Sequence, residues 1–162
     1  MKRVIVISLF FLLTACSGGG NEGIEVVKEY ANEIVPIVNG AYLEIIGQAE
    51  KGELQENLRE TAAKIRNIND KYWDGVDFGG YTDEQIRKWK ILMQNAQGEK
   101  YEINGSELSD ALAYMNLHSM LLADDIEAAL DDPSDEMYEN LGESLGLARE
   151  SAERLIGIIL NR

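Results

Sequence analysis

The residue with the widest chemical repertoire in this chain is its single histidine, His118. Met115 and Met120 lie close to it in sequence, and a thioether beside an imidazole is a pattern that can ligate haem iron. Met120, however, falls about 200° round a helix from His118, so the two side chains cannot share one ligand. We therefore expect His118 to lie at the edge of the core, packed beside Tyr114 and hydrogen-bonded near Asp125.

Other catalytic arrangements lack essential members. A single histidine excludes any site that needs two imidazoles from one chain, including the paired Glu-x-x-His motif of di-iron bundles. No Gly-x-Ser-x-Gly turn accompanies a serine nucleophile, and no Cys-x-x-Cys-His motif could attach haem. With 29 acidic residues, no pair of carboxylates stands out as a glycosidase pair. The sequence predicts no catalytic residue, no metal ligand and no cofactor, and hence a protein that is not an enzyme.

The first sixteen residues have the features of an export signal. Lys2 and Arg3 precede an uncharged, mostly apolar run over residues 4–13. This run is too short to span a membrane, which takes about 20 residues, but it has the length of a secretory signal. It ends in Leu-Thr-Ala followed by Cys16, the only cysteine of the chain.

This ending resembles the lipobox of bacterial lipoproteins. The resemblance implies cleavage before Cys16, a diacylglyceryl group on its sulfur, and usually an acylated amino terminus as well. Two or more acyl chains give stable membrane anchoring. In many such lipoproteins an Asp after the cysteine favours the inner membrane. Because Ser17 stands there, the resemblance points to the outer membrane, facing the periplasm.

The chain thus divides into a signal peptide over residues 1–15, a lipidated Cys16 with a flexible Gly/Ser tether to residue 23, and one domain over residues 24–162. Loss of the two basic residues with the signal lowers the formal charge from −14 to −16. So acidic a chain lacks the basic patch that nucleic acids or anionic lipid head groups require.

The domain is predicted to be all-α. Residues 24–50 carry apolar positions at alternating steps of three and four, which is one helical face, and Pro36 is expected to kink this helix without ending it. Similar stripes run over residues 53–73, from Asn104 onwards, and in the last 25 or so residues. Short connections make consecutive helices antiparallel. The prediction is an up-down antiparallel bundle of four long arms.

Three further features add detail to the predicted bundle. A capping box at Thr82 predicts a short extra helix to about Gln97, after the second arm. Pro133 is expected at the first position of the last helix, where Gly142 and Gly146 would allow close packing of a neighbouring helix. No segment alternates with period two for long enough to predict a strand.

Four of the ten aromatic residues of the mature chain fall within residues 72–81. Aromatics with glycines and acids in a loop suit a recognition surface. They equally suit a cap that closes the core at one end of the bundle. Two aspartates in this loop could suggest calcium, but they lack a full calcium-loop spacing. The candidate partner-binding residues are Trp73, Asp74, Asp77, Phe78 and Tyr81.

Residues 124–139, here called the acidic tip, hold eight acids in sixteen positions, and no base occurs between His118 and Arg149. Acids in the first turn of the last helix suit its dipole, whereas Asp131 and Asp132 oppose the dipole of the preceding helix. This placement indicates a cationic partner, although a solvated, solubilising face is the other interpretation. The candidate partner-binding residues are Asp131, Asp132, Asp135 and Glu136.

The functional prediction is a membrane-anchored, non-catalytic envelope lipoprotein. It would bind a basic protein in the envelope, as an assembly or pilot factor or as an immunity-type protein that blocks a toxin. The alternative is an envelope bundle that binds a small ligand or cofactor.

Overall fold

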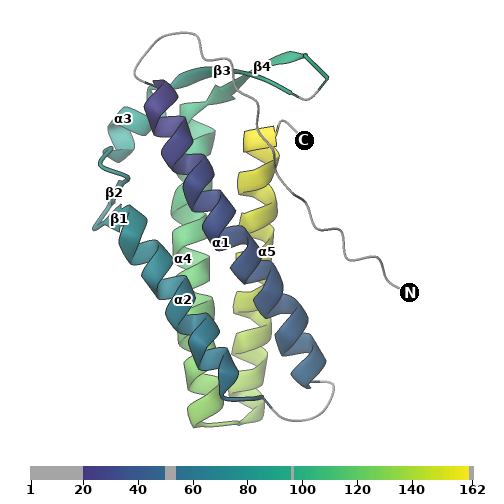
Figure 1. Cartoon of the computed structure of the whole chain (residues 1–162). Helices are drawn as coiled ribbons and strands as arrows, with labels where there is room; N and C mark the ends of the chain where they lie inside the picture. Colours follow the sequence, from purple (N-terminus) through teal and green to yellow (C-terminus); the bar gives the residue numbers. More distant parts are fainter. Residues whose placement is uncertain (1–19, 50–53, 96, 161–162) are drawn as a thin grey trace.

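Four long helices form an antiparallel bundle in the computed structural model, which describes residues 20–49, 54–95 and 97–160 (Figure 1). In chain order α1, α2, α4 and α5 alternate in direction, and each packs against two others, so that they enclose one core. The predicted up-down bundle is confirmed. The four helices are α1 Gly20–Ala49, α2 Asn57–Tyr72, α4 Gly105–Asp131 and α5 Asp135–Leu160.

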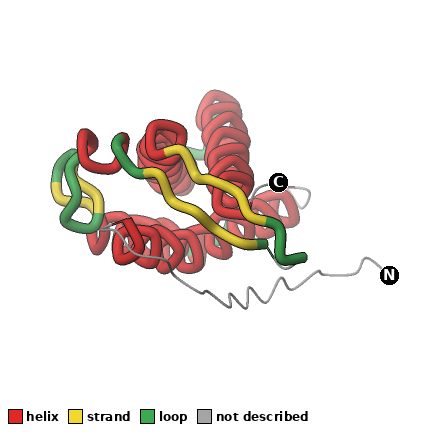
Figure 2. The backbone as a smooth tube through the Cα atoms, turned by 90° about the horizontal axis from the view of Figure 1, so that it is seen from above, coloured by secondary structure: helices red, strands yellow, loops and turns green. Residues whose placement is uncertain are grey.

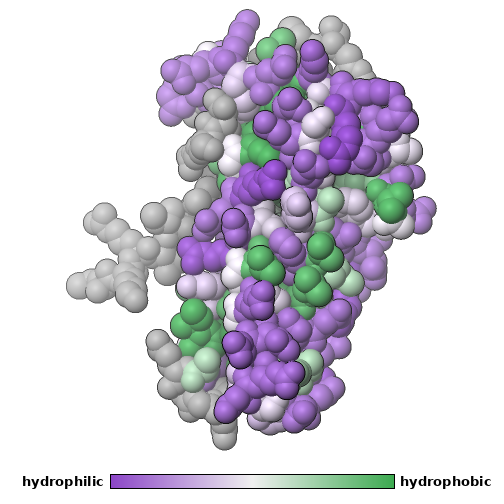
Figure 3. All heavy atoms as spheres, turned by 180° about the vertical axis from the view of Figure 1, so that it is seen from behind, coloured by the Kyte–Doolittle hydropathy of each residue, from purple (hydrophilic) through white to green (hydrophobic). Residues whose placement is uncertain are grey.

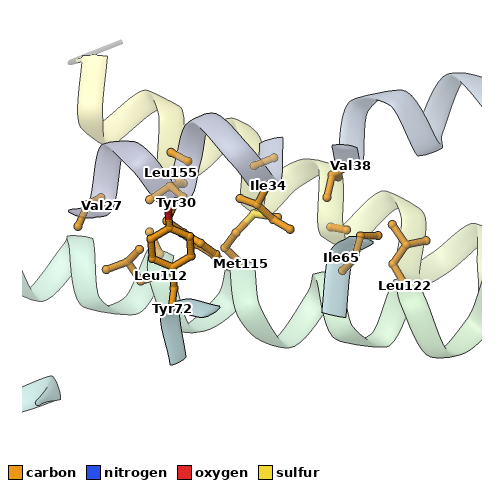
Figure 4. Close-up of a cluster of buried hydrophobic side chains, with 14 of the residues drawn as sticks. Val27, Tyr30, Ile34, Val38, Ile65, Tyr72, Leu112, Met115, Leu122 and Leu155 are labelled. Carbon is orange, nitrogen blue, oxygen red and sulfur yellow. The ribbon is translucent and has the colours of Figure 1, made fainter. Parts of the chain in front are cut away.

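The apolar stripes point into this core. Figure 4 shows Tyr30 and Ile34 of α1 meeting Met115 of α4, with Leu155 of α5 beside them. All four side chains are buried, and Ile34, Met115 and Leu155 belong to the predicted apolar stripes. α1 also continues through Pro36 without ending, as expected.

A polar network runs through the same core. The Tyr30 hydroxyl donates to Asn69 Oδ1 at 2.8 Å, and Asn69 Nδ2 donates to Ser119 Oγ at 2.8 Å and to the Ile65 carbonyl at 3.1 Å. These groups are buried, and a buried polar group without a partner is costly. The network therefore fixes how α1, α2 and α4 meet.

α1 starts earlier than the sequence pattern predicts. Its first turn includes Gly20 to Gly23, residues assigned above to the tether. Gly23 has a packing reason to lie in a helix, since a Cβ there would come within 2.3 Å of the Trp89 ring. The bundle extends to this turn because the indole packs on its backbone.

The predicted helix from Thr82 to Gln97 is wrong beyond its first turns. The capping box forms, with Thr82 Oγ1 accepting from the Gln85 amide, but α3 covers only Asp83–Arg87. The chain then forms an antiparallel hairpin of β3 Lys90–Gln94 and β4 Lys100–Asn104, so the expectation of no strand is also wrong.

The hairpin has a physical basis in two features. Ile91 and Met93 point inward while Leu92 is 68% exposed, which is the alternation of a strand. The turn is built by Asn95, whose side-chain oxygen accepts from the amides of residues 97 and 99, and by Gly98 at φ +84°. Seen from above in Figure 2, the hairpin lies across one end of the bundle.

The α4–α5 connection is shifted slightly from the prediction. Asn104 caps α4 as expected, accepting from the Ser106 amide. Pro133, however, lies before α5 rather than in its first position, because Ser134 provides the cap by accepting from the Met137 amide. Among the helices described, none is long and apolar enough to cross a membrane.

Candidate functional site

The aromatic loop of residues 72–81 caps one end of the bundle. Two short strands, β1 Trp73–Asp74 and β2 Asp77–Phe78, pair across a tight turn. Phe78 is fully buried, and its ring lies edge-on to Tyr30 and to Trp73, with centroids 5.3 and 5.1 Å away. The aromatic side of the loop is therefore part of the core, as the cap interpretation expects.

Little of this loop remains for a partner. Trp73, Asp77 and Tyr81 are half-buried, and Tyr81 packs edge-on to Trp89 at 5.0 Å. Asp74 is exposed. The described residues hold no group of three or more acids, histidines or cysteines that could bind a metal ion.

The acidic tip lies at the opposite end of the bundle. Asp131, Asp132, Asp135 and Glu136 are all exposed there, brought together by the short α4–α5 connection. The structure thus places the four predicted tip residues on one surface, and α2 separates this surface from the aromatic loop.

Two arginines of α2 neutralise part of this surface. Arg59 pairs with Asp131, and Arg66 pairs with both Asp124 and Glu127. These carboxylates raise the pKa of both guanidinium groups. The sequence could not place these bases, because they approach from a different helix.

The rest of the tip keeps its charge. Within the described part of the chain, Asp132, Asp135 and Glu136 make no ion pair. Asp132 caps the C-terminus of α4, where its charge opposes the helix dipole, and the last turn of α4 contains no base. The unpaired part of the tip is therefore centred on the start of α5.

Beside the tip lies an apolar groove that the sequence did not reveal. It has a volume of about 370 Å³ and runs between the C-terminal half of α1 and the N-terminal half of α5. Gly142 and Gly146 lie on its α5 side, and a Cβ on either would meet nothing within 4 Å. The prediction that they allow close helix packing is wrong. The groove is lined by Tyr42, Ile45, Ile46, Ala49, Leu54, Tyr138, Leu141, Gly142, Leu145 and Gly146.

The face formed by α4 and α5 is mostly hydrophilic, with separate apolar patches (Figure 3). On the α4 side, Tyr114, Leu117 and Leu121 are exposed at helical spacing. They form a single stripe along one helix.

His118 belongs to this α4 face and is held by packing. Its ring stacks on Tyr114 with centroids 5.6 Å apart, which confirms the expected packing. The predicted hydrogen bond near Asp125 is wrong, because Ser151 of α5 lies opposite and its Oγ is 2.7 Å from Nδ1. No carboxylate among the described residues hydrogen-bonds to this ring, so it lacks the acid of a hydrolase triad.

The signal peptide, Cys16 and the start of the tether lie outside the described residues. Comparison of the chain with models of protein families, with curated proteins and with solved structures gives no match.

Proposed function

We propose that this chain is a non-catalytic lipoprotein of the bacterial envelope that binds a basic partner protein at its acidic tip. The lipid on Cys16 would hold it in the outer membrane, facing the periplasm. The partner would belong to an assembly or pilot system, or would be a toxin that the protein blocks. The observation that carries the proposal is the set of exposed, unpaired acids Asp132, Asp135 and Glu136.

The direction of α1 supports this arrangement. α1 begins at Gly20, four residues after Cys16, and its 30 residues run about 45 Å to the tip end of the bundle (Figure 1). An anchor on Cys16 would therefore leave the tip facing away from the membrane. Acidic surfaces of this kind steer cationic partners and raise association rates.

The anchor is tested by fatty-acid labelling of cells that express the wild type or Cys16→Ala. We expect the label on the wild type alone, with uncleaved precursor in the variant. Equal labelling of both would contradict the anchor and, with it, the envelope location.

The tip is tested by binding to the protein that co-purifies with the wild type from its own membranes. A triple variant, Asp132→Asn, Asp135→Asn and Glu136→Gln, should associate more slowly and with a weaker salt dependence, because screening acts on long-range steering. The matched control neutralises three exposed acids outside both candidate surfaces, Glu29, Asp70 and Glu102. If the control slows association as much as the tip variant, the tip is not the docking surface.

The apolar groove favours a second candidate, an envelope bundle that binds a small apolar ligand. This candidate predicts a bound molecule, detectable by mass spectrometry of organic extracts of the purified protein. Extracts free of any stoichiometric ligand would contradict it.

A further inference from the structure

We propose that the groove between α1 and α5, here called the α1–α5 groove, is the docking site for an amphipathic, cationic α-helix of the partner. The inference rests on the proposed partner binding and specifies where and how it happens. It is carried by the apolar lining of the groove, by two glycines whose absent side chains would meet none of the described residues, and by the charges at its rim.

The lining is suited to apolar side chains. Its floor is formed by Ile45, Leu141 and Leu145, which are buried, and its sides include Tyr42 and the partly exposed Ile46. Among the described residues, no charged side chain lines it. A groove of this kind binds the apolar face of a helix, as in other helix-in-groove interactions.

The glycines keep the groove open at a cost to α5. A glycine in a helix interior is less favourable than alanine by about 1 kcal/mol, and Gly142 and Gly146 are both in the interior of α5. Gly23 and Gly105 have reasons within the chain, since a Cβ on either would collide with the Trp89 ring or the Ile86 carbonyl. Gly142 and Gly146 have no such neighbour, and larger side chains there would fill the groove.

The dimensions match a short helical contact. From Tyr138 to Gly146, α5 rises about 12 Å, which is a little over two helical turns. A docked helix would place apolar side chains at positions i, i+3 or i+4, and i+7 along this length. Tyr42, one of the lining residues, carries the Arg149 guanidinium 4.5 Å above the centroid of its ring.

The rim charges select the occupant. The start of α5 carries Asp135, Glu136, Glu139 and Glu143, all exposed, along the segment that forms one wall. A second copy of this strongly acidic chain would bring like charge to that rim, and a fatty acid would bring a carboxylate. A helix with an apolar face and lysines or arginines on its other face satisfies both the lining and the rim.

The experiment measures peptide binding to residues 17–162, a chain that retains every described buried residue, from Gly23 to Ile159. The probe is a fluorescent peptide of about 14 residues with leucines at helical spacing and lysines elsewhere, followed by anisotropy. Matched peptides carry glutamates for the lysines, or the same composition scrambled. We expect the Leu/Lys peptide to bind, and the other two to bind at least about tenfold more weakly.

The variants are chosen so that folding is preserved. A Cβ at residue 146 would meet nothing within 4 Å, so Gly146→Leu should place its side chain in the groove and weaken binding of the Leu/Lys peptide about tenfold or more. Gly40→Leu is the matched control, because Gly40 is an exposed α1 glycine outside the groove with equally open space around it. It should bind as the wild type does, and thermal melting should show both variants folded.

Four results would overturn the inference. Equal binding of the scrambled peptide would mean that charge alone attracts the probe. Equal binding of the Leu/Glu peptide would make the groove an apolar ligand site. Displacement of the fluorescent Leu/Lys probe by palmitate as readily as by unlabelled Leu/Lys peptide would mean the same. Wild-type binding by Gly146→Leu would place the contact elsewhere.

The same measurements separate this inference from the proposed function. If Gly146→Leu binds the co-purified partner normally while the tip variant fails, the acidic tip stands and the groove does not. If both variants bind that partner normally, the proposed docking at this end of the bundle fails as a whole.

Discussion

The two ends of the bundle treat their apolar residues in opposite ways. At the aromatic-loop end, Phe78 is buried in the core, and the nearby Glu33 pairs with Lys71. At the tip end, Asp135 and Glu136 are unpaired, and the apolar α1–α5 groove is left without a cover from the described residues. The aromatic-loop end therefore has the features of a packed core, and the tip end has those of a binding surface.

The glycines show the same difference. Gly79 at the loop end has φ +58°, and a Cβ there would lie 2.6 Å from Val26 Cγ1. Gly146 near the tip has helical backbone and open space. The fold requires a glycine at position 79, whereas the packing of the described residues gives no reason for a glycine at position 146.

The largest effect is expected from Phe78→Ala at the aromatic-loop end. Loss of a fully buried aromatic ring leaves a cavity and should lower the free energy of unfolding by about 3–5 kcal/mol, measured by denaturant titration. Val76→Ala is the control, because Val76 is 80% exposed at the turn of the same loop, and its change should stay within about 0.5 kcal/mol. Similar losses in both variants would show that the loop does not cap the core.

The next effect is expected from Asn69→Ala in the buried polar network. It removes the acceptor of the buried Tyr30 hydroxyl and the amide that donates to Ser119 Oγ, which should cost about 1–3 kcal/mol in denaturant unfolding. Asn67→Ala on the exposed face of the same helix should have little effect. A neutral Asn69→Ala would contradict the network shown by the structure.

Gly146→Ala should go the other way and stabilise the protein, by about 0.4–1 kcal/mol, because it restricts the unfolded chain and meets nothing in the folded one. Gly105→Ala should destabilise, since its Cβ would collide with the Ile86 carbonyl. Thermal melting of the two variants tests the contrast directly. Destabilisation by Gly146→Ala would mean that α5 packs more tightly there than the structure shows.

The smallest effect concerns pH. Hydrogen bonds from Lys71 and Tyr72 lower the pKa of Glu33. Its contribution to stability is therefore present above the unfolded value, about 4.3, and is lost as pH falls through the lower folded value. Because the pair is largely exposed, Glu33→Gln should cost less than about 1 kcal/mol at pH 7.

Denaturant unfolding of Glu33→Gln at several pH values provides the check. The gap between the wild type and the variant should close in strong acid, and Lys71→Gln should narrow it in the same way by removing the partner. A gap that persists unchanged below pH 3 would exclude this ion pair as its cause.

The helices were predictable because their apolar stripes repeat over many turns, as in α4 from Leu108 to Ala129. The hairpin was not predictable, because Ile86, Trp89 and Met93 fall at helical spacing. The strand that pairs with β3 begins only at Lys100, six residues after β3 ends. Local pattern favoured the helix, and tertiary pairing favoured the strand.

The candidate surfaces were predictable only in part. The acids of the tip are consecutive enough to be seen in the sequence, but Arg59 reaches Asp131 from another helix. Whether Gly142 and Gly146 are covered depends on how far α1 lies from α5, which no spacing along α5 determines. The sequence position of Phe78 suits both a core cap and a contact surface, and only its burial in the folded chain distinguishes the two.

The central claim, that the tip end binds the partner and the loop end does not, is tested most directly by site-specific photo-crosslinking in the native envelope. A photoreactive residue replaces either Ile46 at the α1–α5 groove or Val76 at the aromatic loop, both of which are exposed. We predict a discrete crosslinked protein from position 46, lost when Gly146→Leu is added, and none from position 76. The same adduct from position 76, or an adduct at position 46 that Gly146→Leu leaves unchanged, would contradict the account.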